Sequence, residues 1–282
     1  MRHLGQSVIA YQSLDFTVMD LLTRAKVLVA KLASADDHVG YMSCAVYDTA
    51  WVAMVAKPTP AGTQWLFPAC FHYILENQQP DGAWPAYAAD IDGILNTAAS
   101  LLALKKHADT PLQLSTPSSG ELNERIVLGI AALGRQLNAW NVDATVHVGF
   151  ELLVPTLLQL LEDENIRFDF PGQELLKAQN HAKLSGFKLE HLYSKHKSTA
   201  IHSLEAFLPT LDYNKIRHHK DFGALMASPS STAAYLMSSS PWDDESEAYL
   251  HDVVRLGAGQ NSGGIPSAFP STYFEVTWVS MC

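Results

Sequence analysis

The spacing of apolar residues is what most limits how this chain can fold. Its apolar side chains recur every three or four residues, as in Ile126, Ile130, Leu133 and Leu137, and this period places them on one face of an α-helix. No segment alternates apolar and polar residues with the period of two that a half-buried strand shows. The pattern predicts an all-α protein, with apolar or helical segments at residues 14–33, 47–57, 68–77, 94–106, 121–139, 150–161, 172–181, 199–207, 231–238 and 244–255.

Turn-rich links separate these segments. Gln78-Gln-Pro-Asp-Gly82 is a strong turn signal, and residues 110–120 are rich in Pro, Ser and Thr. Many helices of roughly ten to fifteen residues with short links favour helical pairs packed in a ring, an α/α barrel, over one long bundle. The ends do not fit a single barrel, because a break at residues 34–40 follows the first helix and a new apolar run begins after Ser271.

Composition limits the classes of partner. Hydrophobic residues make up 48% of the 282 residues and charged residues 17%, so the chain can bury a core. Its 19 basic and 29 acidic residues give a net charge of −10 without a basic block, which argues against nucleic acid as a partner. No apolar run is long enough to cross a bilayer. The odd number of cysteines, 3 in all, and the lack of a convincing signal peptide predict a cytoplasmic protein.

Several motifs together carry a resemblance to a known family. The motifs are Ser43–Ala53, Gln78–Trp84, Ile94–Leu104, His147–Pro155, Ile201–Phe207, Ala227–Leu236 and Gly263–Trp278. Each motif alone is a weak signal, whereas their common order over most of the chain is specific. In their order and residues they resemble the class II diterpene cyclases, especially the fungal bifunctional copalyl diphosphate/ent-kaurene synthases.

The resemblance implies a domain arrangement and a reaction. In this family one α/α barrel, γ, is inserted into another, β, after the first β helix. Residues 1–35 would then be the first helix of β, residues 36–270 the γ domain, and residues 271–282 the truncated return into β. The implied reaction is the cyclisation of geranylgeranyl diphosphate to copalyl diphosphate in diterpenoid biosynthesis, with Mg²⁺ as cofactor.

The family starts this reaction with an acid that is missing here. An alkene is a very weak base, so its protonation needs a strong carboxylic acid in a dry pocket, which the family supplies from a DxDD motif in the β domain. This sequence contains no DxDD. Ala89-Asp-Ile-Asp-Gly93 has only two of the carboxylates and is interpreted as a turn. We therefore expect the chain by itself to be inactive.

His202 is the candidate catalytic residue. By the resemblance, it belongs to a pair that positions the water which removes the final proton, and imidazole can accept a proton near neutral pH. The partner, an Asn in plant relatives, falls at Ser267, whose hydroxyl can still hold a water. The alternative is a satisfied core histidine beside Ser203.

Candidate binding residues have weaker signals. The aromatic rings of Tyr47 and Trp51 could stabilise a carbocation, although aromatic residues on an apolar helix are more often core. Lys195 and Lys197 could meet a diphosphate or lie in a solvated loop. Asp143 is the remaining acid of the family's Mg²⁺-binding cluster, and one carboxylate alone makes a poor cation site, so a solvated loop residue is the alternative.

Three further motifs are interpreted as structural. Glu162–Asn165 is read as a solvated helix end. Asp243–Glu247 fits the DDxxE pattern of class I terpene synthases, yet it follows Pro241 at an expected helix start, where acids are favoured by the helix dipole. Gln78, Gly82 and Trp84 are expected to tie successive helices at a barrel corner.

Two other classes of function stay open at this point. A stand-alone α/α barrel could bind a prenyl or other apolar ligand without chemistry. An α/α-barrel glycoside hydrolase would need two suitably spaced carboxylates in one cleft, and the order of the motifs speaks against it.

Overall fold

The fold was analysed in a computed structural model of the 282-residue chain. The structure describes Thr23, Lys26, Gly40 and residues 42–208, 210–260, 262–272 and 274–275. Contacts divide the chain into two compact units, one of Val39–Ser271 and one of Met1–His38 with Thr272–Cys282, and the fold below is that of the first. The helix expected at 14–33 and the return into a second barrel lie almost wholly outside the described residues, and the proposed domain limits stay a prediction.

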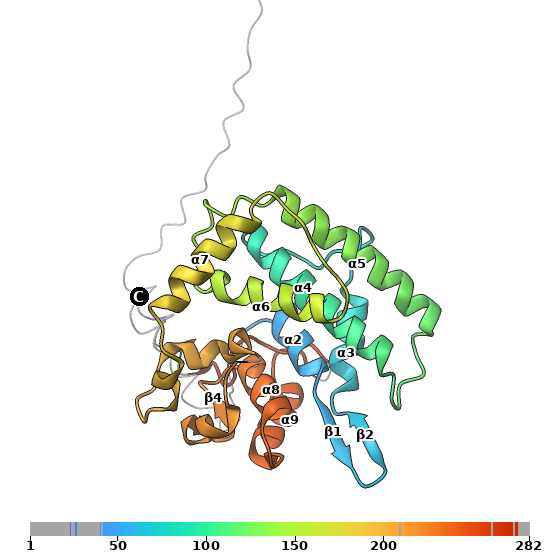
Figure 1. The fold of residues 1–282 in the computed structure, drawn as a ribbon. Coiled ribbons are helices and arrows are strands. Elements are labelled where there is room, and N and C mark those ends of the chain that lie inside the picture. Colours follow the sequence, from blue (N-terminus) through green and yellow to red (C-terminus); the bar gives the residue numbers. More distant parts are fainter. Residues whose placement is uncertain are drawn as a thin grey trace, which may run out of the picture. The chain divides into compact units, whose positions relative to one another are not determined.

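Helices alternate along the described chain between an inner ring and an outer layer (Figure 1). Neighbouring inner elements contact one another, and the last contacts the first, which closes the ring. The inner elements are α2 (Val46–Ala53), α4 (Asp90–Asp109), α6 (Phe150–Asp163), η2 (Thr199–Phe207) and α8 (Pro229–Ser238). The outer elements, each packed on an inner neighbour, are α3 (Pro68–Glu76), α5 (Ser119–Ala139), α7 (Gln173–Ser185), η3 (Tyr213–His219) and α9 (Asp244–Leu256). The predicted all-α class with an α/α barrel is confirmed.

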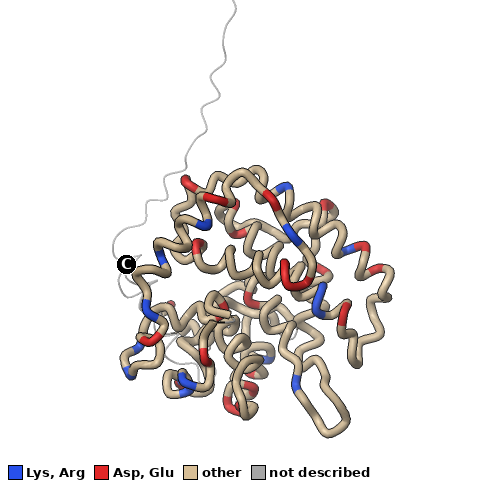
Figure 2. Tube along the Cα trace, viewed as in Figure 1, with Lys and Arg blue, Asp and Glu red and all other residues tan. Residues whose placement is uncertain are grey.

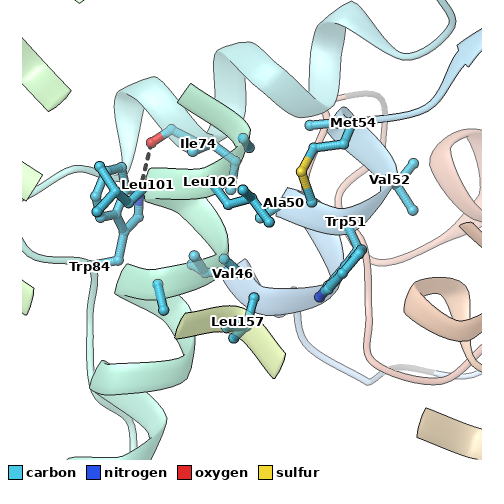
Figure 3. Close-up of a cluster of buried hydrophobic side chains, with 14 of the residues drawn as sticks. Val46, Ala50, Trp51, Val52, Met54, Ile74, Trp84, Leu101, Leu102 and Leu157 are labelled. Atoms are coloured by element: carbon cyan, nitrogen blue, oxygen red, sulfur yellow. Dashed lines mark hydrogen bonds between the residues drawn. The ribbon is translucent and has the colours of Figure 1, made fainter. Parts of the chain in front are cut away.

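The hydrophobic core fills the ring around α2. Val46, Ala50 and Val52 are fully buried on α2, and they meet apolar side chains of the neighbouring helices, including Leu101 and Leu157 (Figure 3). Seven of the eight residues of α2 are buried, including the polar residues Asp48 and Thr49. The helix therefore lies inside the protein as one member of the inner ring.

Local signals fix where several helices begin. The Ser118 hydroxyl accepts a hydrogen bond from the backbone N–H of Glu121 at the start of α5. Ser228 caps α8 in the same way, and Asp243 caps α9. Such caps satisfy N–H groups that have no partner within the helix. The acids at Asp243–Glu247 are thus a helix start, as predicted.

Pro155 lies inside α6, which begins five residues earlier. A proline has no N–H, so the carbonyl of Glu151 loses its helical partner. The Asn180 side chain of α7 donates to this carbonyl at 2.7 Å. The neighbouring helix therefore supplies the hydrogen bond that Pro155 cannot make.

Short strands and 3-10 helices depart from the sequence prediction. β1 (Ala56–Thr59) pairs antiparallel with β2 (Gly62–Trp65), and β3 (Lys220–Asp221) pairs with β4 (Ala224–Leu225). The apolar stretch 47–57 is therefore helical only as far as Ala53, and its last two residues, Ala56 and Lys57, belong to β1. η1 (Leu189–Tyr193), η2 and η3 are 3-10 rather than α-helical.

The segment Ala89–Gly93 is a helix start and not the expected turn. Asp90 begins α4, and the Asp92 carboxylate accepts hydrogen bonds from the backbone N–H groups of Ala88 and Ala89 at 2.9 and 3.1 Å. Asp92 thus caps its own helix, which explains why two acids occur here.

The Gln78–Trp84 motif joins α3, α4 and α5, as predicted. The Trp84 indole N–H donates to the carbonyl of Ile74 at 2.8 Å, and the Gln78 amide donates to the carbonyls of Gly82 and Arg125. Gly82 has a φ of +90°, a conformation that glycine adopts without strain. The motif is a corner of the barrel.

Charged residues are distributed over the described surface. Figure 2 shows Lys and Arg spread among Asp and Glu along the chain rather than gathered in one stretch. Among the residues that the structure describes, no helix is both long and apolar enough to span a membrane.

Candidate functional site

A cavity of about 660 Å³ opens between α6, α7 and η2. Its apolar lining includes Leu152 and Leu153 of α6 together with Phe187 and Phe207. Its polar lining includes His202 from η2. An apolar cavity with a few convergent polar groups is the usual form of a small-molecule site.

His202 is half-buried at a break in η2. The next residue, Ser203, leaves helical geometry with φ −136° and ψ 50°, so η2 consists of two short turns joined by a kink. Burial lowers the pKa of His202 below its ordinary value, and a hydrogen bond to its own backbone offsets part of this effect. A lowered pKa favours the neutral imidazole, which is the form that can accept a proton.

A buried polar network lies on the other side of η2. Glu205, which is 2% exposed, accepts a hydrogen bond from the Tyr47 hydroxyl at 3.1 Å and another from the Ser231 hydroxyl at 3.0 Å. The backbone N–H of Tyr47 donates to the Asn96 side chain at 3.1 Å. The network thus joins α2, α4, η2 and α8 inside the ring.

Asp48 adds a second buried carboxyl group to this network. Burial raises the pKa of Asp48 to about 7, although hydrogen bonds from Ser230 lower it in part. Burial also raises the pKa of Glu205 to about 7, and the charge of Asp48 adds to this rise. Within the described part of the chain, no Lys, Arg or His forms an ion pair with either group. Without a cation, two buried carboxylates disfavour each other's ionisation.

The predicted partner of His202 is not joined to it by a hydrogen bond among the described residues. Ser267 is half-buried, its hydroxyl contacts the Met42 sulfur at 3.2 Å, and it does not line the cavity of His202. The pairing of His202 with Ser267 stays a prediction.

The two candidate aromatic residues of α2 have different surroundings. The Tyr47 hydroxyl is engaged by Glu205. Trp51 is 2% exposed and lines a second, smaller cavity of about 340 Å³ with Met54 and Met237. The rings of Tyr47 and Trp51 meet edge to face, 6.4 Å apart. Trp51 therefore belongs to the core, and a role of either ring in binding stays a prediction.

The predicted charged ligands lie on the surface. Lys195, Lys197 and Asp143 are all exposed, and Lys197 forms an ion pair with Asp221. Among the described residues, no group of three or more His, Cys, Asp or Glu could hold a metal ion. These residues do not by themselves fit Mg²⁺, which prefers several oxygen ligands.

The sequence analysis did not predict that the buried acids Asp48 and Glu205 lie close together. Their motifs were recognised, but no role as a pair was predicted. One signal was present: each acid stands in an apolar stretch, and the hydroxyl-rich segment Ser228–Thr232 offers donors for buried carboxylates.

Comparison with known proteins finds relatives that match most of this chain. A pimaradiene synthase of Emericella nidulans is 55% identical over 262 residues, which are 93% of this chain and 27% of the relative. A copalyl diphosphate synthase of Talaromyces verruculosus is 52% identical over 263 residues, covering 92% of this chain and 27% of the relative. Over about nine tenths of its length the chain is thus similar to fungal diterpene synthases. It spans about a quarter of the length of these curated relatives.

Solved structures agree with the fold. An ent-copalyl diphosphate synthase of Arabidopsis thaliana, in complex with (S)-15-aza-14,15-dihydrogeranylgeranyl thiolodiphosphate, matches with a TM-score of 0.68 and 27% identity over 90% of this chain and 34% of that chain. Abietadiene synthase from Abies grandis has a TM-score of 0.69 at 24% identity, covering 90% of this chain and 32% of that one, and supports the fold alone. No family model matches the sequence.

Proposed function

We propose that this chain is the γ-type barrel that supplies the His202 wall of an active site for the class II cyclisation of geranylgeranyl diphosphate to copalyl diphosphate. The observation that carries the proposal is the half-buried His202 imidazole in the lining of a mostly apolar cavity, where burial lowers its pKa. A relative named for this product, the copalyl diphosphate synthase of Talaromyces verruculosus, is 52% identical to the chain over 263 residues.

His202 would act at the end of the reaction. Cyclisation leaves a carbocation, which becomes an alkene when a neighbouring carbon loses a proton. A neutral imidazole, or a water that it holds, can accept that proton. The apolar walls formed by Leu152, Leu153 and Phe207 would keep other water away from the cation. The initial proton must come from outside these residues, since the sequence has no DxDD.

A chimera tests the proposal. The segment of the Talaromyces verruculosus copalyl diphosphate synthase that aligns with this chain is replaced by the chain, and geranylgeranyl diphosphate turnover is measured by gas chromatography after dephosphorylation. We expect copalol as the product. His202→Ala in the chimera should lower kcat by about 10²–10⁴-fold, the usual contribution of a general base.

The control variant changes a histidine outside the cavity. His181 of α7 is exposed, and His181→Ala should leave kcat unchanged. A chimera that folds and turns over substrate equally well with and without His202 would contradict the proposed role of this residue.

A second candidate is a non-catalytic module that binds a prenyl or other apolar ligand. It is favoured by one observation: the 660 Å³ cavity is lined by this chain's own residues. Ligand binding without turnover by the isolated chain fits both candidates, whereas an inactive chimera would favour the second.

A further inference from the structure

The η2 segment is the weak member of the inner ring. It is a 3-10 helix, whose hydrogen bonds are poorer than those of the α-helices beside it, and Ser203 interrupts it. His202 precedes this kink directly. The direction of its imidazole therefore depends on what holds the two residues that follow.

Side chains from three other elements hold the turn after the kink. The backbone N–H of Leu204 donates to the Ser231 hydroxyl at 2.7 Å, and its carbonyl accepts from the Tyr213 hydroxyl at 2.7 Å. The carbonyl of Ala206 accepts from the Thr156 hydroxyl at 2.7 Å. These bonds replace the backbone partners that a regular helix would provide.

The Glu205 carboxyl group completes this set of contacts. Ser231 has one hydroxyl hydrogen, which it donates to Glu205, so its oxygen is free to accept from Leu204. The other Glu205 oxygen receives the Tyr47 hydroxyl. Glu205 therefore orients the Ser231 hydroxyl that fixes the kink, and it links η2 to α2 and α8 together.

We propose that Glu205 is a positioning residue, which holds the kinked η2 segment against α2 and α8 and thereby directs His202 into the cavity. The inference rests on the proposed function only in taking His202 as the functional group. Every contact used is made by a buried or half-buried side chain.

The test reads the His202 imidazole directly in the full chain without ligand. NMR of the chain labelled at histidine ring carbons follows the 12 histidines over a pH series, and His202→Gln identifies the resonance. The wild type should titrate below the ordinary histidine value. In Glu205→Ala the imidazole should become more accessible to water, so its pKa should move up toward that value.

A conservative variant separates positioning from simple loss of stability. Glu205→Gln keeps one acceptor and offers one N–H that the Tyr47 hydroxyl can accept, so the His202 titration should stay that of the wild type. If Glu205→Ala does not fold, Tyr47→Phe removes one of the two donors and should give a smaller shift in the same direction. Glu121→Gln on the exposed side of α5 is the matched control and should change nothing.

The outcomes decide the inference separately from the proposed function. Folded Glu205→Ala and Tyr47→Phe variants with a wild-type His202 titration would overturn it, whatever the chimera does. The His202 titration could change in the Glu205 variant while the turnover of the chimera is unaffected by His202→Ala. That result would uphold the positioning role and overturn the proposed function.

Discussion

His107 is a buried imidazole stacked between two aromatic rings. Its ring lies 3.7 Å from Phe71 and 3.9 Å from Trp65 by ring centroids, and its Nε2 hydrogen-bonds to the Ala53 carbonyl at 2.8 Å. Since a carbonyl only accepts, Nε2 carries the hydrogen. Burial lowers the pKa of His107 to about 4, so the group stays neutral down to acidic pH.

This residue should make stability depend on pH. The unfolded chain binds a proton at His107 near pH 6.5 and the folded chain only near 4. The contribution of His107 to the free energy of unfolding is therefore complete above pH 6.5 and is lost as pH falls through 4. The loss amounts to at most about 3 kcal/mol. We expect the free energy of unfolding of His107→Gln to depend less on pH over this range than that of the wild type, as measured by urea unfolding.

The variant must be compared with the wild type at each pH, because Asp48 and Glu205 change the free energy of unfolding with pH in the opposite direction to His107. Their carboxyls titrate near 4 when unfolded and at about 7 when folded, so they cost stability as pH rises between these values. His181→Gln, at an exposed position of α7, is the control. An identical slope in His107→Gln and the wild type would contradict the prediction.

At the scale of elements, the turn between α3 and α4 depends on Gly82. Its φ is +90°, and a Cβ built there would lie 2.3 Å from the backbone oxygen of Leu128 on α5. Gly82→Ala should therefore lower the free energy of unfolding by about 2 kcal/mol or more, from backbone strain and from displacement of α5. Thermal and urea unfolding measure this loss.

Substitutions at two other glycines separate the effect of backbone strain from that of the clash with α5. Gly62 has a φ of +119° but no neighbour within 4 Å of a Cβ, so Gly62→Ala carries strain without a clash and should cost less. Gly120 lies in α5 with a free Cβ position, and Gly120→Ala should be neutral or stabilising. Equal losses at Gly82 and Gly62 would show that close packing against α5 does not matter.

At the scale of the whole molecule, the proposed reaction needs the proton donor of a DxDD motif, which the sequence lacks. We expect the 282-residue chain, incubated with geranylgeranyl diphosphate and Mg²⁺, to give no copalol by gas chromatography after dephosphorylation. The cavity should still bind the prenyl group of the substrate. The melting temperature of the protein should therefore rise with the concentration of geranylgeranyl diphosphate. Copalol from the isolated chain would refute this prediction.

What the sequence determined by itself is the local part of the fold. The helices α3, α5 and α9 begin and end close to the expected residues, because periodicity, caps and turn glycines act over a few residues. The predicted corner at Gln78–Trp84 holds for the same reason. The place of Pro155 inside α6 was harder to predict. Pro155 leaves the Glu151 carbonyl without a helical partner, and the side chain that bonds this carbonyl, Asn180, lies 25 residues beyond Pro155.

Only the tertiary structure decided the surroundings of the candidate site. Tyr47 and Glu205 are 158 residues apart in sequence and hydrogen-bonded in the ring. Side chains of α6, α8 and η3 bond the backbone of the kinked η2. The raised pKa of Glu205 and the lowered pKa of His202 both follow from burial. Burial depends on which distant segments pack together, and no local pattern encodes it.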